Sequence, residues 1–202
     1  MKSDSKTFEE NERIAAAIRS GAVGVYPTDT VYGLIASALL PEAVGRIFTL
    51  KGRHESKPPI VLIQTLRDLE IFPVNFDGHV RAFLEKAWPA RLSVILPVAP
   101  EMHQKLAYLH RGTGSIAFRM PDDAALREFI GRAGPLAAPS ANPQGRVPAA
   151  TVAEAKAYFG NTVDFYVDGG TLVSLPSTLI ALEGGRLRIV REGAFPIVPG
   201  AF

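Results

Sequence analysis

The sequence predicts a single α/β domain in which helices flank one twisted, mixed β-sheet. Amphipathic helical segments alternate with short apolar runs along the chain, and no internal repeat or linker-like stretch separates them. Most of the 16 prolines lie at the ends of the expected elements. Two late apolar runs are joined by Glu183-Gly184-Gly185-Arg186, which is typical of a hairpin and argues against a purely parallel sheet.

The first expected element is a helix. The segment Thr7-Phe8-Glu9-Glu10 matches a capping box and places the start of the helix there. Ile14, Ala17 and Ile18 then fall on one face, and Gly21 ends the helix. Residues 22–26 form a compact β-type run that Pro27 closes, and we expect a helical turn after Thr30.

The central elements follow from apolar spacing. In residues 41–50, Val44, Ile47, Phe48 and Leu50 recur at helical spacing, which predicts a helix with these side chains inward. The remaining helices are expected at residues 80–88, 122–132 and 152–159, the last of them capped by Thr151. Short apolar runs predict strands at residues 60–63, 92–96, 115–119, 136–139, 165–167, 178–182 and 187–190.

Length and composition limit the class of protein. A chain of 202 residues with 47% hydrophobic residues can bury one sizeable core, so we expect one domain over residues 1–202. A net charge of +2 is too small for general coating of nucleic acid, although it allows a local basic patch. The absence of cysteine excludes a disulfide framework, a thiolate metal site and a cysteine nucleophile.

The chain shows no sign of membrane association. No segment reaches the roughly 18 apolar residues that a membrane-spanning helix needs. The first six residues are polar and do not resemble a signal peptide. We therefore expect a cytoplasmic protein.

Three polar segments stand beside apolar runs and are the candidate binding elements. They are residues 27–33, residues 51–53 and residues 139–146. Each combines hydroxyls, an amide or positive charge with Gly or Pro, which suits close approach to an anionic ligand with many oxygens. P-loop, dinucleotide-binding and HExxH zinc motifs are missing from the sequence.

Each segment also has a purely structural interpretation. Thr30 can cap a helix instead of contacting a ligand. Lys51, Arg53 and Lys57 can complement a helix C-terminus instead of clamping phosphates. Asn142 can serve a turn. The four histidines lack ligand spacing, and we expect all of them at the surface: His54, His79, His103 and His110.

Hydroxyl and arginine side chains also occur at the ends of several expected strands. Ser115 and Arg119 bracket one strand, Ser177 precedes another, and Arg191 follows the last. Convergence of such groups is what an anion pocket on an α/β scaffold needs.

Six motifs together resemble the YrdC-like threonylcarbamoyl-AMP synthase family, in family order from about residue 10 to 195. The matching segments are Pro27–Gly33, Lys51-Gly52-Arg53, Ile116–Pro121, Ala138–Pro143 with Gly145-Arg146, Pro176–Ile180 and Val190–Gly193. The resemblance implies a YrdC-like fold with a concave basic cavity, without the C-terminal extension domain of longer relatives. It also implies synthesis of threonylcarbamoyl-AMP and pyrophosphate from L-threonine, bicarbonate and ATP with Mg²⁺, with no prosthetic group and no metal site of the protein's own.

The resemblance also assigns roles to residues. Thr30, Arg119 and Ser177 correspond to the threonine contacts. The residues that correspond to the nucleotide contacts are Arg53, Lys57, Ser115, Ser140, Asn142 and Arg191, and Lys51 and Arg53 are the expected catalytic pair. The implied downstream partner is a transferase that modifies adenosine 37 of tRNA, and direct contact with RNA or tRNA is left open.

Three positions depart from the family pattern. Leu62 replaces a histidine at the amino-acid site, Ala90 and Ser93 alter the PGPxT element, and Pro148 replaces a serine. We expect Leu62 either to form an apolar wall that weakens selectivity for threonine or to pack into the core. Two alternative functions follow: a paralogue that activates a different carbamate with ATP, or a nucleotide- or RNA-binding module without synthase activity.

Overall fold

The computed structural model describes residues 2–52, 57–183 and 186–197. Its strands form one nine-stranded sheet in the order β7-β1-β2-β6-β3-β5-β4-β8-β9. The strands are β1 (Gly24–Tyr26), β2 (Gly33–Ser37), β3 (Ile60–Leu62), β4 (Leu92–Pro97), β5 (Ser115–Arg119), β6 (Leu136–Ala137), β7 (Phe165–Tyr166), β8 (Thr178–Glu183) and β9 (Arg186–Arg191).

The sheet is mixed, as the sequence predicts. Strands β1 and β7, β3 and β5, and β4 and β8 pair in parallel, whereas the other neighbours are antiparallel. The late pair β8–β9 is antiparallel, which confirms the expected hairpin pairing, although residues 184–185 of its turn lie outside the described residues.

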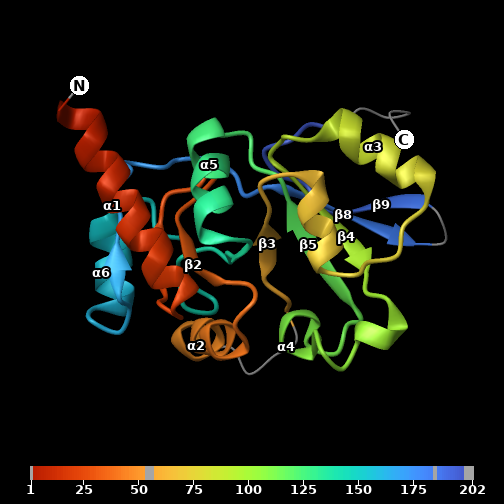
Figure 1. Ribbon diagram of the computed structural model, residues 1–202, viewed down its shortest axis with the longest axis horizontal. Coiled ribbons are helices and arrows are strands. Elements are labelled where there is room, and N and C mark those ends of the chain that lie inside the picture. Colours follow the sequence, from red (N-terminus) through yellow and green to blue (C-terminus); the bar gives the residue numbers. More distant parts are fainter. Residues whose placement is uncertain (1, 53–56, 184–185, 198–202) are drawn as a thin grey trace.

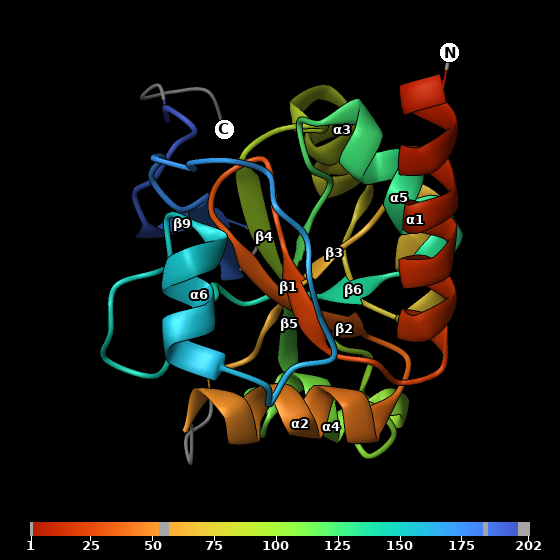
Figure 2. The same cartoon turned by 90° about the vertical axis from the view of Figure 1, so that its left-hand side faces the viewer.

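Helices cover both faces of the sheet. They are α1 (Lys2–Arg19), α2 (Pro41–Lys51), α3 (Gly78–Ala87), α4 (Ala107–His110), α5 (Ala124–Ala133) and α6 (Val152–Phe159), with 3₁₀ turns η1 (Leu66–Ile71) and η2 (Pro100–Met102). Helices α1 and α5 lie side by side on one face, and α6 lies on the opposite side (Figures 1 and 2). None of the described helices is long and apolar enough to cross a bilayer.

The core has two layers because side chains alternate along the strands. Tyr26, Ile35 and Leu62 pack toward α1 and α5, beside Leu126 and Phe129. Their strand neighbours point to the other face and join the larger layer, which contains Val25, Leu34, Val61, Val44, Ile47 and Phe48. The two layers fill the faces of the sheet, and the candidate site is built from residues at the ends of the strands.

The structure corrects two expectations near the N-terminus. Helix α1 already begins at Lys2, so Thr7 lies inside the helix and does not start it. The segment after Thr30 enters strand β2, not a helical turn. The threonine hydroxyls favour a helix N-cap in the sequence, but in the structure they close a turn between β1 and β2.

The expectation of four surface histidines is wrong for His110. This side chain is buried at the end of α4, where the backbone N–H of Gly112 donates to Nδ1 at 3.1 Å and Nε2 contacts the carbonyl of His103 at 2.8 Å. His79 and His103 are exposed, and His54 lies outside the described residues. Since both ring nitrogens of His110 contact backbone, its role is structural.

Candidate functional site

One open cavity collects polar side chains from both halves of the sheet. About 420 Å³ of space lies between its walls, part of which is open to solvent. Its lining residues are Thr28, Thr30, Val31, Gly33, Ile60, Arg119, Ala138, Ser140, Pro176, Ser177 and Arg191. The lining therefore contains two arginines and four hydroxyl side chains but no acidic side chain.

The loop between β1 and β2 is held by its own threonines. The hydroxyl of Thr28 donates to the carbonyl of Val31 at 2.6 Å and accepts the backbone N–H of Thr30 at 3.3 Å. The two threonine hydroxyls lie 3.2 Å apart. Because a threonine hydroxyl can satisfy the backbone of its own turn, this sequence forms a compact loop without a helix. Thr30 is thereby fixed facing Arg119.

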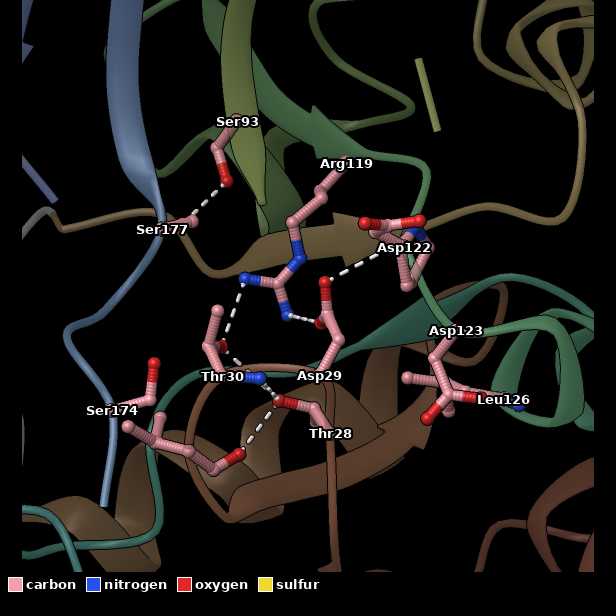
Figure 3. A network of polar contacts seen from close by, with 12 residues as sticks. Thr28, Asp29, Thr30, Ser93, Arg119, Asp122, Asp123, Leu126, Ser174 and Ser177 are labelled. Carbon is pink, nitrogen blue, oxygen red and sulfur yellow. Dashed lines mark hydrogen bonds and ion pairs between the residues drawn. The ribbon is translucent and has the colours of Figure 1, made fainter. Parts of the chain in front are cut away.

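Arg119, at the end of β5, is the central cation of the site (Figure 3). Its Nη1 donates to the hydroxyl of Thr30 at 3.2 Å, and its Nη2 forms an ion pair with Oδ1 of Asp29 at 3.0 Å. The backbone N–H of Asp122 donates to the other carboxylate oxygen, Oδ2, at 3.1 Å. Within the described residues, Nε of Arg119 is buried without a hydrogen-bond partner. The guanidinium is therefore anchored on two sides and keeps further N–H donors, that of Nε among them.

Burial lowers the pKa of Arg119, and the negative charge of Asp29 opposes that shift. Arg191 and Arg91 lower the pKa of Arg119 further, so these cations lie close enough to repel it. A guanidinium remains charged in spite of such shifts. The site therefore holds a fixed, partly desolvated positive charge, which is favourable for an anionic ligand.

A second anchored group comes from β4, β8 and β9. The hydroxyls of Ser93 and Ser177 lie 2.8 Å apart, and both side chains are fully buried. Arg191 donates from Nη2 to the carbonyl of Ser177 at 2.8 Å and from Nε to the same oxygen at 3.3 Å. These bonds fix the guanidinium of Arg191 beside Ser177 at the cavity wall.

The loop after β6 is tied from behind by Lys51. The hydroxyl of Ser140 donates to Oδ1 of Asn142 at 2.6 Å, and the amide of Asn142 donates to the carbonyl of Arg146 at 2.7 Å. The Lys51 ammonium donates to the carbonyls of Ser140 and Asn142 and is only 1% exposed. Lys51 and Asn142 thus shape the loop that presents Ser140 to the cavity.

Some of the site residues predicted from the sequence line the cavity, and others lie away from it. The cavity lining includes five of them: Thr30, Arg119, Ser140, Ser177 and Arg191. Ser115 stands at the other end of β5 from Arg119, roughly 13 Å away at the usual rise per strand residue. Lys57 is exposed just before β3, and Arg53 lies outside the described residues.

Leu62 does not belong to the lining residues. It is fully buried in the layer beneath α1 and α5. The expectation of an apolar cavity wall at Leu62 is therefore wrong, and the alternative of core packing is confirmed. Sequence reasoning also missed the supporting roles of Asp29 and Ser93, whose partners lie about ninety residues away in the chain.

Comparisons with known proteins connect this fold to one family. The sequence model of the Sua5/YciO/YrdC family, described as "Telomere recombination", matches residues 16–193. A threonylcarbamoyl-AMP synthase of Bacillus subtilis is 35% identical over 182 residues, covering 89% of this chain and 52% of the relative. A threonylcarbamoyl-AMP synthase of Halorhodospira halophila is 33% identical over 158 residues, covering 77% of this chain and 80% of the relative.

Solved structures share the architecture. Pyrococcus abyssi Sua5 in complex with L-threonine matches with a TM-score of 0.83 and 30% identity, over 92% of this chain and 54% of that one. Escherichia coli YciO matches with a TM-score of 0.79 and 24% identity, over 92% and 89% of the two chains, which supports the fold alone. This chain thus spans about half the length of the Bacillus and Pyrococcus relatives.

Proposed function

Because this chain belongs to the Sua5/YciO/YrdC family, we propose that it is an L-threonylcarbamoyladenylate synthase. Such an enzyme is a nucleotidyltransferase that converts L-threonine, bicarbonate and ATP into threonylcarbamoyl-AMP and pyrophosphate. The observation that carries the proposal is a cavity lined by two anchored guanidinium groups, Arg119 and Arg191, and by four hydroxyls. The threonylcarbamoyl-AMP synthase relatives at 33–35% identity supply the reaction class.

We assign the amino-acid end of the cavity to Thr30, Arg119 and Ser177. The guanidinium of Arg119 lines the cavity and suits a carboxylate, because a guanidinium binds carboxylates through parallel N–H donors. Thr30 and Asp29 hold that guanidinium in place before substrate arrives. Pre-organised donors lose little freedom on binding, which favours recognition of a small substrate.

We assign the nucleotide end to Ser140 and Arg191, with further contacts from Arg53, Lys57, Ser115 and Asn142. Ser140 and Arg191 line the same cavity as the amino-acid residues. Lys51, predicted as catalytic, acts in this proposal through the Ser140 loop that it holds. We retain Arg53 as a phosphate clamp, and this assignment rests on the sequence motif alone.

The chemistry suits this set of side chains. Bicarbonate loses hydroxide to give carbon dioxide, which the amine of threonine attacks to yield a carbamate, and the proton lost by the amine converts the hydroxide to water. A carbamate oxygen then attacks the α-phosphorus of ATP, and the bond to the β-phosphate oxygen breaks to release pyrophosphate. Such a displacement depends on alignment and on neutralisation of phosphate charge more than on a nucleophilic side chain.

Magnesium enters this scheme with ATP as part of the substrate. Among the described residues, no group of three or more His, Cys, Asp and Glu side chains is arranged to hold a metal ion. Mg²⁺ in nucleotide-dependent enzymes commonly keeps phosphate oxygens and water as ligands. The product would pass to a tRNA threonylcarbamoyl transferase.

The direct test is pyrophosphate release with bicarbonate and ATP, comparing L-threonine, L-serine, L-valine and no amino acid. We expect release that depends on threonine, and a product with the mass of threonylcarbamoyl-AMP. Release with another amino acid only would favour the paralogue, and ATP binding without release would favour a binding module.

A matched pair of variants connects activity to the cavity. Thr30→Val keeps the side-chain shape but removes the hydroxyl that accepts from Arg119. Thr49→Val makes the same change on the exposed face of α2. We expect the first to lower turnover at least about tenfold, as for loss of a hydrogen bond to a charged group, and the second to leave it unchanged.

A further inference from the structure

Among the described residues, the Ser93 hydroxyl is hydrogen-bonded to the site through Ser177. Ser93 lies on β4, is fully buried, and is not among the cavity-lining residues. Its hydroxyl oxygen is 2.8 Å from that of Ser177, which precedes β8 and does line the cavity (Figure 3). The parallel pairing of β4 with β8 brings the two hydroxyls together, with Leu92 opposite Thr178.

The direction of this hydrogen bond follows from burial. A serine hydroxyl has one hydrogen to donate and two lone pairs that accept. Within the described residues, Ser177 is the one side-chain partner of the Ser93 hydroxyl. If Ser177 donated, the hydrogen of Ser93 would be buried without an acceptor, and buried hydroxyls are rarely left so. Ser177 is also buried, but it lines the cavity, where water or a ligand can accept its hydrogen, so Ser93 is assigned as the donor.

The hydrogen of Ser177 is then free for the cavity. Its oxygen accepts from Ser93 at 2.8 Å and from Nη2 of Arg191 at 3.4 Å. Both neighbours donate, so the remaining hydrogen has no acceptor among them. A hydroxyl in this state offers a donor, which suits an anionic oxygen and not an ammonium group.

We propose that Ser93 is a positioning residue that holds Ser177 as a hydrogen-bond donor to an anionic oxygen of the bound substrate. This inference rests on the proposed function, in which that oxygen belongs to the carboxylate or carbamate of the amino acid. Arg191 supports the same arrangement by holding the carbonyl of Ser177. Ser93 acts on binding without touching substrate.

The test is a double-mutant cycle with Ser93→Ala, Ser177→Ala and the double variant, using the full chain. Each variant is titrated separately with L-threonine and with MgATP, and its KM and kcat are measured. We expect Ser93→Ala to raise the KM for L-threonine about fivefold to tenfold with kcat nearly unchanged. In the Ser177→Ala background, Ser93→Ala should add nothing, because the partner through which it acts is gone.

Two controls separate positioning from stability. Ser93→Thr keeps the hydroxyl and should restore the KM to within about twofold of the parent, as expected for a retained hydrogen bond. Ser37→Ala removes another buried serine hydroxyl, on β2 and outside the cavity lining, and should leave the KM unchanged. A KM effect in the Ser177→Ala background, failure of Ser93→Thr to restore binding, or a larger effect on MgATP than on L-threonine would overturn the proposal.

A crystal structure of Ser93→Ala provides a readout that needs no turnover. We expect the Ser177 side chain to leave its present rotamer when the buried donor is removed. An unmoved Ser177 would overturn the positioning role even if the parent is an active synthase. Absence of pyrophosphate release by the parent would instead overturn the proposed function, while the position of Ser177 in the variant still decides the present inference.

Discussion

Arg119 shows at the level of one residue how the fold prepares an anion site. Its guanidinium uses Nη1 for Thr30 and Nη2 for Asp29, and both partners come from the loop between β1 and β2. The side chains of Arg119 and Asp29 are 5% and 1% exposed, so the pair is largely removed from water. A buried pair of this kind adds little net stability, but it fixes the directions of the remaining N–H donors.

We expect Arg119→Lys to impair binding of L-threonine. Lysine keeps the positive charge near Asp29, but its three N–H donors sit on one nitrogen. They cannot replace a planar guanidinium that reaches Thr30, Asp29 and a ligand from separate nitrogens. The KM for L-threonine should rise at least about tenfold, equivalent to about 1.4 kcal/mol. Steady-state kinetics check this, with Arg67→Lys as an exposed control outside the cavity. An unchanged KM in Arg119→Lys would show that binding of L-threonine does not depend on the planar arrangement of the guanidinium N–H donors.

The sequence predicts individual site residues better than their supports. Thr30, Ser140 and Arg191 stand in short polar motifs next to apolar runs, and such motifs can be recognised locally. Asp29 is part of a recognisable motif, but its partner Arg119 is ninety positions away. Only the folded sheet brings the two together, so no local pattern could reveal the pair.

At the scale of elements, the clearest difference concerns the segment after β1. A threonine hydroxyl that accepts a backbone N–H is equally useful at a helix N-cap and in a tight turn. Strand β2 (Gly33–Ser37) is buried along its whole length, so it lacks the alternation of apolar and polar residues that identifies a half-buried strand. The local chemistry was therefore ambiguous, and the pairing of β2 with β1 and β6 resolved it.

Tyr26 joins three elements, and its titration provides a test of their packing. Its ring stacks on Phe129 of α5 with centroids 4.4 Å apart, and its hydroxyl donates to Asn11 of α1 at 3.4 Å. Burial raises the pKa of Tyr26 to about 12, with smaller contributions from Asp123 and Glu10. In the unfolded chain the phenol titrates near its usual pKa of about 10.

The direction in which stability changes with pH follows from the difference between the folded-state and unfolded-state pKa of Tyr26. The raised pKa in the folded state means that the contribution of Tyr26 to stability is complete below about pH 10 and is lost as the pH rises toward about 12. Tyr26→Phe keeps the ring but cannot ionise, so it should lose less stability than the parent over this interval. Urea unfolding at several pH values measures the difference, with Tyr158→Phe on α6 as control. Equal losses in the parent and in Tyr26→Phe would contradict the prediction.

At the scale of the whole molecule, the cavity joins the two halves of the sheet. Thr30 and Ser140 come from loops around β1, β2 and β6. Arg119 and Arg191 come from β5 and β9, and Ser177 directly precedes β8. The halves meet where β6 pairs with β3, at Val61 and Ala137. A ligand that contacts both groups of residues would link distant parts of one sheet, so its binding energy should resist unfolding of the whole domain.

We therefore expect MgATP to raise the thermal unfolding temperature, and Arg191→Ala to reduce that increase. A ligand at 100 times its Kd stabilises the folded state by about 2.7 kcal/mol, which for a chain of this size corresponds to roughly 5–10 °C. Loss of a charge-assisted contact from Arg191 should weaken binding about tenfold or more, and at the same MgATP concentration the shift should fall to about half or less. Differential scanning calorimetry with and without MgATP measures both shifts, and Arg67→Ala should retain the full one. A full MgATP shift in Arg191→Ala would show that this residue does not bind the nucleotide. The absence of a shift in every protein would show that the nucleotide does not bind in the cavity.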